Sequence, residues 1–84
     1  MNYTLGILRR AQKELSAIEG DAYIQMRDAI RALAHAPRPI GSKKLRGRSG
    51  WRIRVGHYRV IYEIDDTNCV ITIMRVGHRR EIYR

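Results

Sequence analysis

The clearest pattern of apolar and polar positions lies between residues 51 and 64, where apolar side chains alternate with polar ones. Such alternation is typical of strands with one buried face. A two-residue turn at Gly56 and His57 would make this segment a hairpin and bring its apolar side chains to one face. These residues are Trp51, Ile53, Val55, Tyr58, Val60, Tyr62 and Ile64. Residues 69–76 are apolar on both faces, which predicts a central strand.

Towards the N-terminus the spacing of apolar residues changes from two to three or four. Residues 2–8 alternate and fit a short first strand. Helical spacing then runs over residues 8–18 and again over residues 23–33. We expect Gly20 to end the first helix in a left-handed conformation and Asp21 to cap the N-terminus of the second. The two helices therefore form an αα-hairpin.

The connector between the second helix and the hairpin, residues 37–50, is rich in proline, glycine and cations. Pro37 ends the helical run, because the residue before a proline avoids helical torsion angles. The apolar stripes of the two helices are too narrow for a self-sufficient bundle, so the helices need a sheet to cover. The sequence therefore predicts one α+β domain over residues 1–84. It has an N-terminal strand, a two-helix hairpin and a three-stranded antiparallel meander, in one sheet with the helices packed on one face.

Positive charge is concentrated in the second half of the chain. The net charge is +9, and residues 38–84 carry twelve basic and four acidic side chains, against five and four in residues 1–37. No acidic residue occurs between Asp28 and Glu63. Such a charge distribution attracts polyanions, of which nucleic acid is the commonest in a cytoplasm. A basic surface that serves solubility alone is the alternative.

The rest of the composition excludes several classes of protein. Cys69 is the single cysteine, so the chain forms no internal disulfide and a reducing compartment is indicated. The cysteine and three histidines form no cluster at metal-ligand spacing. No apolar run approaches the roughly 18 residues that cross a bilayer, and charged residues interrupt the N-terminus before a signal peptide could form. We therefore expect a cytoplasmic protein without membrane contact.

The hairpin register places three arginines on the face opposite the apolar residues. With the turn at residues 56–57, Arg54 lies directly across from Arg59, and Arg52 shares their face. Facing like charges destabilise a sheet by about 0.2 to 1 kcal/mol, and an anion between them removes the repulsion. Guanidinium groups bind phosphate oxygens as two-pronged donors, which favours a phosphate site. The alternative is that the three charges only guard an exposed sheet against self-association.

Three motifs resemble the RelE family of toxins from type II toxin-antitoxin pairs. They are KKLRG (43–47), WRIRVGHYRVIYEI (51–64) and VGHRREIYR (76–84), and looser matches in LRRAQKEL and RALAHAPRP extend the likeness over nearly the whole chain. The resemblance implies a RelE-like, microbial-ribonuclease-type fold. It also implies cleavage of messenger RNA in the ribosomal A site, by attack of the RNA 2'-hydroxyl on the adjacent phosphate, with no metal or other cofactor. The implied partners are the ribosome, messenger RNA and a RelB-like antitoxin that is acidic and partly disordered.

By this resemblance the catalytic positions lie on the hairpin and in the C-terminal tail. Arg52 and Arg54 occupy the positions of paired cations, and Arg59 occupies that of the phosphate clamp. Arg79 is the candidate acid, and Tyr83 is the aromatic residue that orients or stacks on the nucleotide. The first pair departs from the usual family pattern, which has lysines there. Because arginine holds its proton firmly, electrostatic stabilisation is expected of this pair rather than proton abstraction.

Histidine is the side-chain type that exchanges protons near neutral pH, so both histidines near the arginines are candidates. We interpret His57 as a turn residue. His78, next to Arg79 in the sequence, has a possible catalytic or substrate-orienting role. We expect the remaining cations in the motifs to bind RNA or the ribosome. The alternative is that they belong to a solvated loop without a binding role. These are Lys43, Lys44, Arg46, Arg48 and Arg80.

Two other functions compete with the nuclease. A toxin of the ParE type shares the fold but poisons DNA gyrase and needs no phosphate site. The tail GHRREIYR, with Arg79 and Tyr83, favours the nuclease. A ribosome- or RNA-binding module that does not cleave is the other alternative, and the arginines in place of lysines keep it open.

Overall fold

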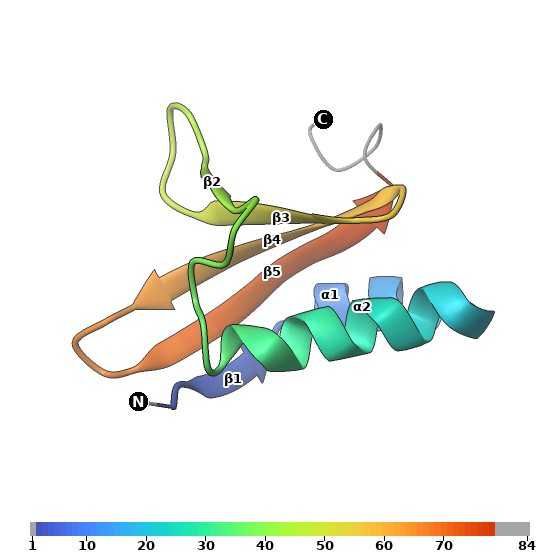
Figure 1. Cartoon of the computed structure of the whole chain (residues 1–84), viewed down its shortest axis with the longest axis horizontal. Helices are drawn as coiled ribbons and strands as arrows, with labels where there is room; N and C mark the ends of the chain where they lie inside the picture. The colour runs from blue at the N-terminus through green and yellow to red at the C-terminus, as the bar shows by residue number, and fades with distance from the viewer. Residues whose placement is uncertain (1, 79–84) are drawn as a thin grey trace.

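The computed structural model describes residues 2–78, which form a five-stranded mixed sheet and two helices (Figure 1). In chain order the elements are β1 (Thr4–Ile7), α1 (Arg9–Ser16), α2 (Gly20–Leu33), β2 (Lys43–Lys44), β3 (Trp51–Val55), β4 (Tyr58–Asp65) and β5 (Val70–His78). The strand order is β1-β5-β4-β3-β2. β1 runs parallel to β5, and the other neighbours are antiparallel. The predicted α+β plan is therefore confirmed, with the short strand β2 added inside the segment predicted as a connector.

The hydrophobic core lies between the helices and one face of the sheet. Figure 1 shows α2 crossing below the sheet with α1 behind it. The helices and their connection contribute Ala11, Ile18, Met26, Ile30 and Leu33, and the strands contribute Ile53, Val60, Tyr62, Ile71, Ile73 and Val76. Burial of each large side chain stabilises the fold by about 1.5 to 3 kcal/mol. Within the described residues, neither helix is long and apolar enough to cross a membrane.

Tyr62 connects this core to the segment that precedes β2. Its ring is fully buried, and its hydroxyl donates a hydrogen bond to the carbonyl of Pro37 at 2.7 Å. Burial disfavours the charged phenolate and raises the pKa of Tyr62 to about 12. The hydroxyl therefore remains a donor at physiological pH and fixes the start of the chain segment that leads to β2.

The turn between the helices confirms one predicted feature and corrects two others. Gly20 has φ = 65°, the predicted left-handed conformation, but it does not end the first helix as predicted: α1 ends at Ser16, and Gly20 is the first residue of α2. The prediction that Asp21 caps α2 is wrong, because Glu19 occupies the N-cap position without a side-chain hydrogen bond. Only a few residues separate the helices, so the chain enters α2 directly through Gly20. Asp21 lies inside the first turn, where a carboxylate interacts favourably with the helix dipole.

The register of the hairpin is the predicted one. Arg54 pairs with Arg59, and Arg52 pairs with Ile61. An unpredicted irregularity follows between β4 and β5: Ile61 pairs with Arg75 and Tyr62 with Ile73, so Met74 is an extra residue in β5. This bulge keeps both Ile73 and Val76 of β5 on the core side, although three positions separate them.

The helix α1 completes the sheet edge beside β5. β1 pairs with β5 only as far as Ile73, so the later residues of β5 need another partner. The carboxylate of Glu14 on α1 accepts a hydrogen bond from the backbone N–H of Val76 at 3.0 Å. It also binds the guanidinium of Arg75 at 3.0 Å. One side chain thus joins the helix to the edge strand.

Candidate nucleic-acid interface

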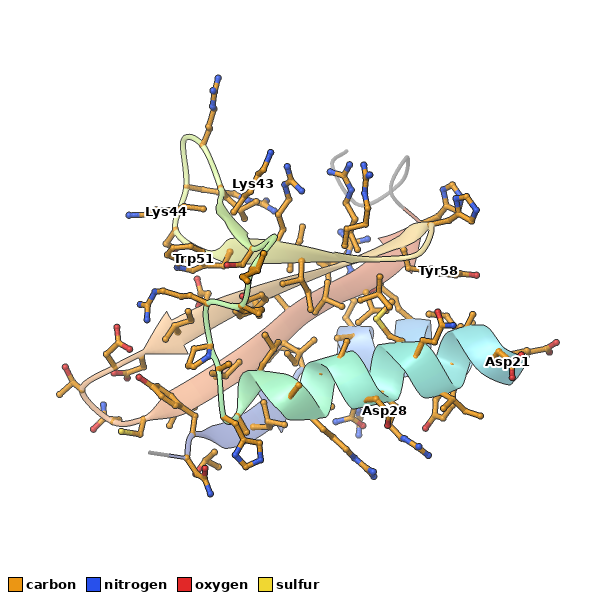
Figure 2. The ribbon with its side chains drawn as sticks, in the orientation of Figure 1. Asp21, Asp28, Lys43, Lys44, Trp51 and Tyr58 are labelled. Atoms are coloured by element: carbon orange, nitrogen blue, oxygen red, sulfur yellow. The ribbon has the colours of Figure 1, made fainter. Side chains whose placement is uncertain are left out.

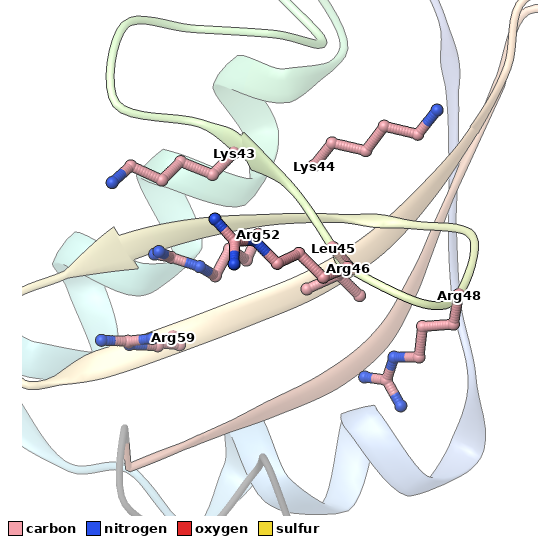
Figure 3. Close-up of a pocket in the computed structure, with 7 residues that line it drawn as sticks. All are labelled: Lys43, Lys44, Leu45, Arg46, Arg48, Arg52 and Arg59. Atoms are coloured by element: carbon pink, nitrogen blue, oxygen red, sulfur yellow. The ribbon is translucent and has the colours of Figure 1, made fainter.

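A hollow with a basic lining lies on the face of the sheet opposite the core. Its volume is about 620 Å³. Its lining residues are Lys43, Lys44, Leu45, Arg46, Arg48, Arg52 and Arg59 (Figure 3). We call it the basic hollow. All four predicted loop cations therefore line the same hollow as Arg52 and Arg59 of the hairpin.

Strand β2 folds the basic loop back against β3. Lys43 pairs with Arg52 and Lys44 with Trp51, and the carbonyl of Gly50 accepts a hydrogen bond from the N–H of Leu45 at 3.0 Å. Gly50 has φ = 121°, and a Cβ added there would lie 3.1 Å from Cδ1 of Leu45. Glycine is favoured at this return of the chain, because L residues rarely adopt this torsion angle and an added Cβ would require Leu45 to shift.

The side chains of the basic hollow take two directions. In Figure 3 the side chains of Lys43, Arg46 and Arg52 extend towards the same side as Arg59. Lys44 extends to the opposite side. Side chains alternate along a strand, so the neighbours Lys43 and Lys44 cannot serve the same site equally. The structure therefore separates two lysines that the sequence treated as one group.

Arg54 has a different environment from its partner in the register. It does not line the basic hollow, and it borders a hollow of about 300 Å³ between α2 and β3, with Ala29, Ile40 and Ile53. Arg52 and Arg59 are thus brought together at the basic hollow, whereas Arg54 is exposed and is not part of its lining. The predicted pairing of Arg54 with Arg59 is correct for the backbone. The arginine that lines the hollow together with Arg59, however, is Arg52.

The charges around the basic hollow are not balanced by acids. Among residues 2–78, no acidic side chain lines it. The acidic Asp21 and Asp28 lie on α2, on the other side of the sheet from Lys43 and Lys44 (Figure 2). A concentration of cations in a concave surface raises the local concentration of anions, with an effect that falls as salt rises. The geometry suits a phosphate chain better than a neutral ligand.

Two histidines lie together at one end of the sheet, His57 in the turn between β3 and β4 and His78 at the end of β5. The rings of His57 and His78 stack with centroids 6.3 Å apart, and Tyr58 meets His78 edge to face at 6.0 Å. His57 occupies the turn, as predicted. His78 pairs with Tyr58, one register step beyond the pair Arg59 and Gly77. A side chain type that can exchange protons is therefore present near the arginines.

Three predicted site residues, Arg79, Arg80 and Tyr83, lie outside the described residues. Their predicted roles stay predictions.

Arg38 is a residue whose contribution the sequence did not reveal. Its guanidinium lies 5.1 Å from the ring centroid of Trp51 and binds Asp66 at 2.8 Å. Tyr3 donates to the same carboxylate at 2.6 Å. The hydrogen bonds from Arg38 and Tyr3 lower the pKa of Asp66. Arg38 thus holds the chain before β2 against β3, a contact between distant residues that no local pattern predicts.

Comparison with known sequences gives two matches over almost the whole chain. Residues 6–83 match the family model described as ParE toxin of type II toxin-antitoxin system, parDE. The chain is also 31% identical over 86 residues to Toxin RelG of Mycobacterium tuberculosis, covering 100% of this chain and 99% of that protein.

Solved structures share the arrangement of helices and strands. The archaeal RelE-RelB complex from Pyrococcus horikoshii gives a TM-score of 0.84 at 28% identity, over 96% of this chain and 99% of that one. The toxin-antitoxin complex RelBE2 from Mycobacterium tuberculosis gives a TM-score of 0.83 at 26% identity, over 96% of this chain and 95% of that one. The isolated RelE toxin of E. coli gives a TM-score of 0.74 at 28% identity, over 96% of this chain and 90% of that one.

Proposed function

This chain belongs to the ParE toxin family of type II toxin-antitoxin systems, within the RelE/ParE superfamily, and from this we propose that it is a ribosome-dependent endoribonuclease. It would act in the cytoplasm, cleave messenger RNA in the ribosomal A site and so inhibit translation. The observation that carries the proposal is the basic hollow, in which Arg52 and Arg59 meet the loop cations and no acid of the described residues lines the wall.

The proposed reaction is an internal transfer at phosphorus. The RNA 2'-oxygen attacks the adjacent phosphate, its proton leaves to a base, and the bond to the 5'-oxygen breaks. The products are a 2',3'-cyclic phosphate and a 5'-hydroxyl, which takes up a proton. Arg52 and Arg59 would stabilise the additional negative charge on the phosphate as it becomes pentavalent.

Proton transfer needs groups other than these arginines, because a guanidinium does not give up its proton near neutral pH. We propose His78 as a proton-transferring or orienting residue, because it precedes Arg79 in the sequence and its partner in the register, Tyr58, precedes Arg59. Arg79 and Tyr83 remain the predicted acid and the predicted nucleotide-orienting ring. Arg54, outside the lining of the hollow, would contribute to the electrostatic field.

We also propose a RelB-like antitoxin as the partner. Two of the related structures, from an archaeon and from E. coli, are complexes of RelE with RelB. A net charge of +9 favours an acidic partner, and a partly disordered segment that folds on binding could cover a large part of the surface. Such a segment would lie over the open face of the sheet or displace the C-terminal tail.

Gyrase poisoning is the second candidate, because the matching family model is described as ParE toxin. That activity would not need Arg52 and Arg59 to share a phosphate. A ribosome-binding module without nuclease activity is the third, because arginines replace the family's usual lysines. The three functions differ in their products: cut message, altered DNA supercoiling, or neither.

The test is controlled induction in cells, with growth, translation, message ends and plasmid supercoiling read together. Wild type should arrest growth, stop translation and leave cuts in ribosome-bound message with normal supercoiling, and co-expression of an adjacent acidic reading frame should restore growth. Arg59→Ala should lower cleavage at least a hundredfold, the usual size for loss of a transition-state contact. The control is Arg31→Ala, which removes an exposed arginine from α2 and should remain toxic.

Equal toxicity of wild type and Arg59→Ala would contradict the nuclease assignment. Altered supercoiling with intact message would select the gyrase function. Ribosome binding without cut message would select the third candidate.

A further inference from the structure

Two other hollows adjoin the basic hollow, and Arg48 lines all three. One, of about 660 Å³, contains Trp51 and Lys44. The other, of about 320 Å³, lies where α1 meets the sheet and contains Leu8, Arg10 and Met74. We call them the Trp51 hollow and the α1 hollow. An RNA strand that extends beyond the nucleotide bound in the basic hollow would leave it through the Trp51 hollow or the α1 hollow.

Charge distinguishes the two exits. The lining of the Trp51 hollow is mixed, because Arg38, Lys44 and Arg48 share it with the carboxylates of Glu63 and Asp65, which repel phosphates. The α1 hollow is lined by Arg10, Arg48 and Arg75, with no acidic side chain among its described lining residues. The electrostatic field therefore favours a polyanion in the α1 hollow.

The sheet register connects the basic hollow to the α1 hollow. On the face away from the core, a row of paired positions crosses four strands, from Lys43 through Arg52 and Ile61 to Arg75. Neighbouring strands are about 4.8 Å apart, so the row spans roughly 14 Å. Arg10 on α1 lies beyond the end of this row, in the same hollow as Ile61 and Arg75. The path is thus continuous across one face.

The α1 hollow offers both kinds of contact that a nucleotide needs. Glu14 already binds Arg75, so Arg10 and Arg48 are the cations left for a phosphate there. Leu8 keeps 43% of its surface exposed, and Met74, which lines the same hollow, is partly exposed. Apolar side chains of this kind can contact the face of an unpaired base.

We propose that the α1 hollow is a second nucleotide subsite, in which Arg10 and Arg48 bind a backbone phosphate and Leu8 and Met74 contact a base. The inference rests on the proposed function, since it extends the same RNA across the sheet. It assigns to α1 a role in substrate binding that the motifs in the hairpin and tail do not indicate.

The experiment compares two lengths of RNA carrying 2'-O-methyl groups, which prevent cleavage. Binding of a labelled dinucleotide and a labelled octanucleotide is measured by fluorescence anisotropy over a series of salt concentrations. Arg10→Ala should weaken binding of the octanucleotide about two- to fivefold at low salt, the usual size for one exposed ion pair. It should also lower the slope of log affinity against log salt by about 0.7, the value for one phosphate on a single strand. Binding of the dinucleotide should not change.

The matched control is Arg9→Ala, which removes the same charge from the neighbouring exposed position of α1. Arg9 does not line the α1 hollow. Equal effects of Arg9→Ala and Arg10→Ala on the octanucleotide would overturn the subsite, because only the general field would then be involved. A wild type that binds both RNAs with the same affinity would overturn it and leave the proposed function standing. Failure of wild type to bind either RNA would overturn the subsite, whereas the proposed function, which depends on the ribosome, is tested separately by cut message in cells. If Arg10→Ala spares RNA but weakens binding of the acidic partner, the hollow belongs to that partner instead.

Discussion

The two faces of the sheet are made by the same strands but follow different rules. On the core face, Ile53, Val60 and Tyr62 are buried against the helices, and their alternation is what allows the hairpin to fold. On the opposite face, Arg54 faces Arg59 although like charges at paired positions are unfavourable. One face is therefore arranged for stability, whereas the other keeps an arrangement that stability alone does not explain.

The largest expected effect comes from damage to the core face. Ile73→Ala should lower the free energy of unfolding by about 2 to 5 kcal/mol, because Ile73 is fully buried in β5 and its loss leaves a cavity. Urea denaturation followed by circular dichroism measures it. Thr72→Ala, one position earlier and on the other face, is the control and should cost much less. Similar losses for both would mean that the two faces are not energetically distinct.

High pH gives a second test of the core face. Burial raises the pKa of Tyr62 to about 12 from 10.0, so its folded pKa exceeds its unfolded one. The protonated Tyr62 therefore contributes on the order of 2 to 3 kcal/mol to the free energy of unfolding below pH 10. This contribution is lost as pH rises from about 10 to about 12. The difference in unfolding free energy between wild type and Tyr62→Phe should shrink or reverse across this range. A constant difference would show that Tyr62 ionises equally in both states.

The smallest expected effect concerns the opposite face. Arg54→Glu replaces a like-charged pair with an opposite-charged one, so it should raise the free energy of unfolding by about 0.2 to 1 kcal/mol while weakening RNA binding. Thermal and urea denaturation measure the first effect, and anisotropy measures the second. Arg46→Glu makes the same charge change in the loop and serves as the control. A loss of stability in Arg54→Glu beyond that control would show that the arginine pair does not oppose folding.

The features predicted from sequence are those set by local periodicity. The alternation and the two-residue turn at Gly56 and His57 determine the pairing of Arg54 with Arg59, so the hairpin and its basic face were predictable. The bulge after Ile61 was not, because it depends on how β4 meets β5 and the core. Strand β2 has only two residues, too few for any period, so its segment was predicted as a connector.

The candidate site was predictable in composition but not in geometry. The acid-free stretch indicated an anion site and included Arg52, Arg59 and the loop cations, which the structure brings together. The opposite directions of Lys43 and Lys44 follow from β2, and the position of Arg54 outside the lining follows from packing beside α2. Arg10 lies far away in sequence and reaches the same face only because α1 packs against β5.

The contact of Glu14 with the N–H of Val76 determines where the sheet stops growing. A strand edge with unused backbone donors is a template on which another copy of the chain can add a strand. Here a carboxylate from α1 occupies that donor, and the ion pair with Arg75 keeps it there. The part of β5 that extends beyond its pairing with β1 is thereby covered by a helix, which makes strand addition from a neighbouring molecule unfavourable along this part of the edge.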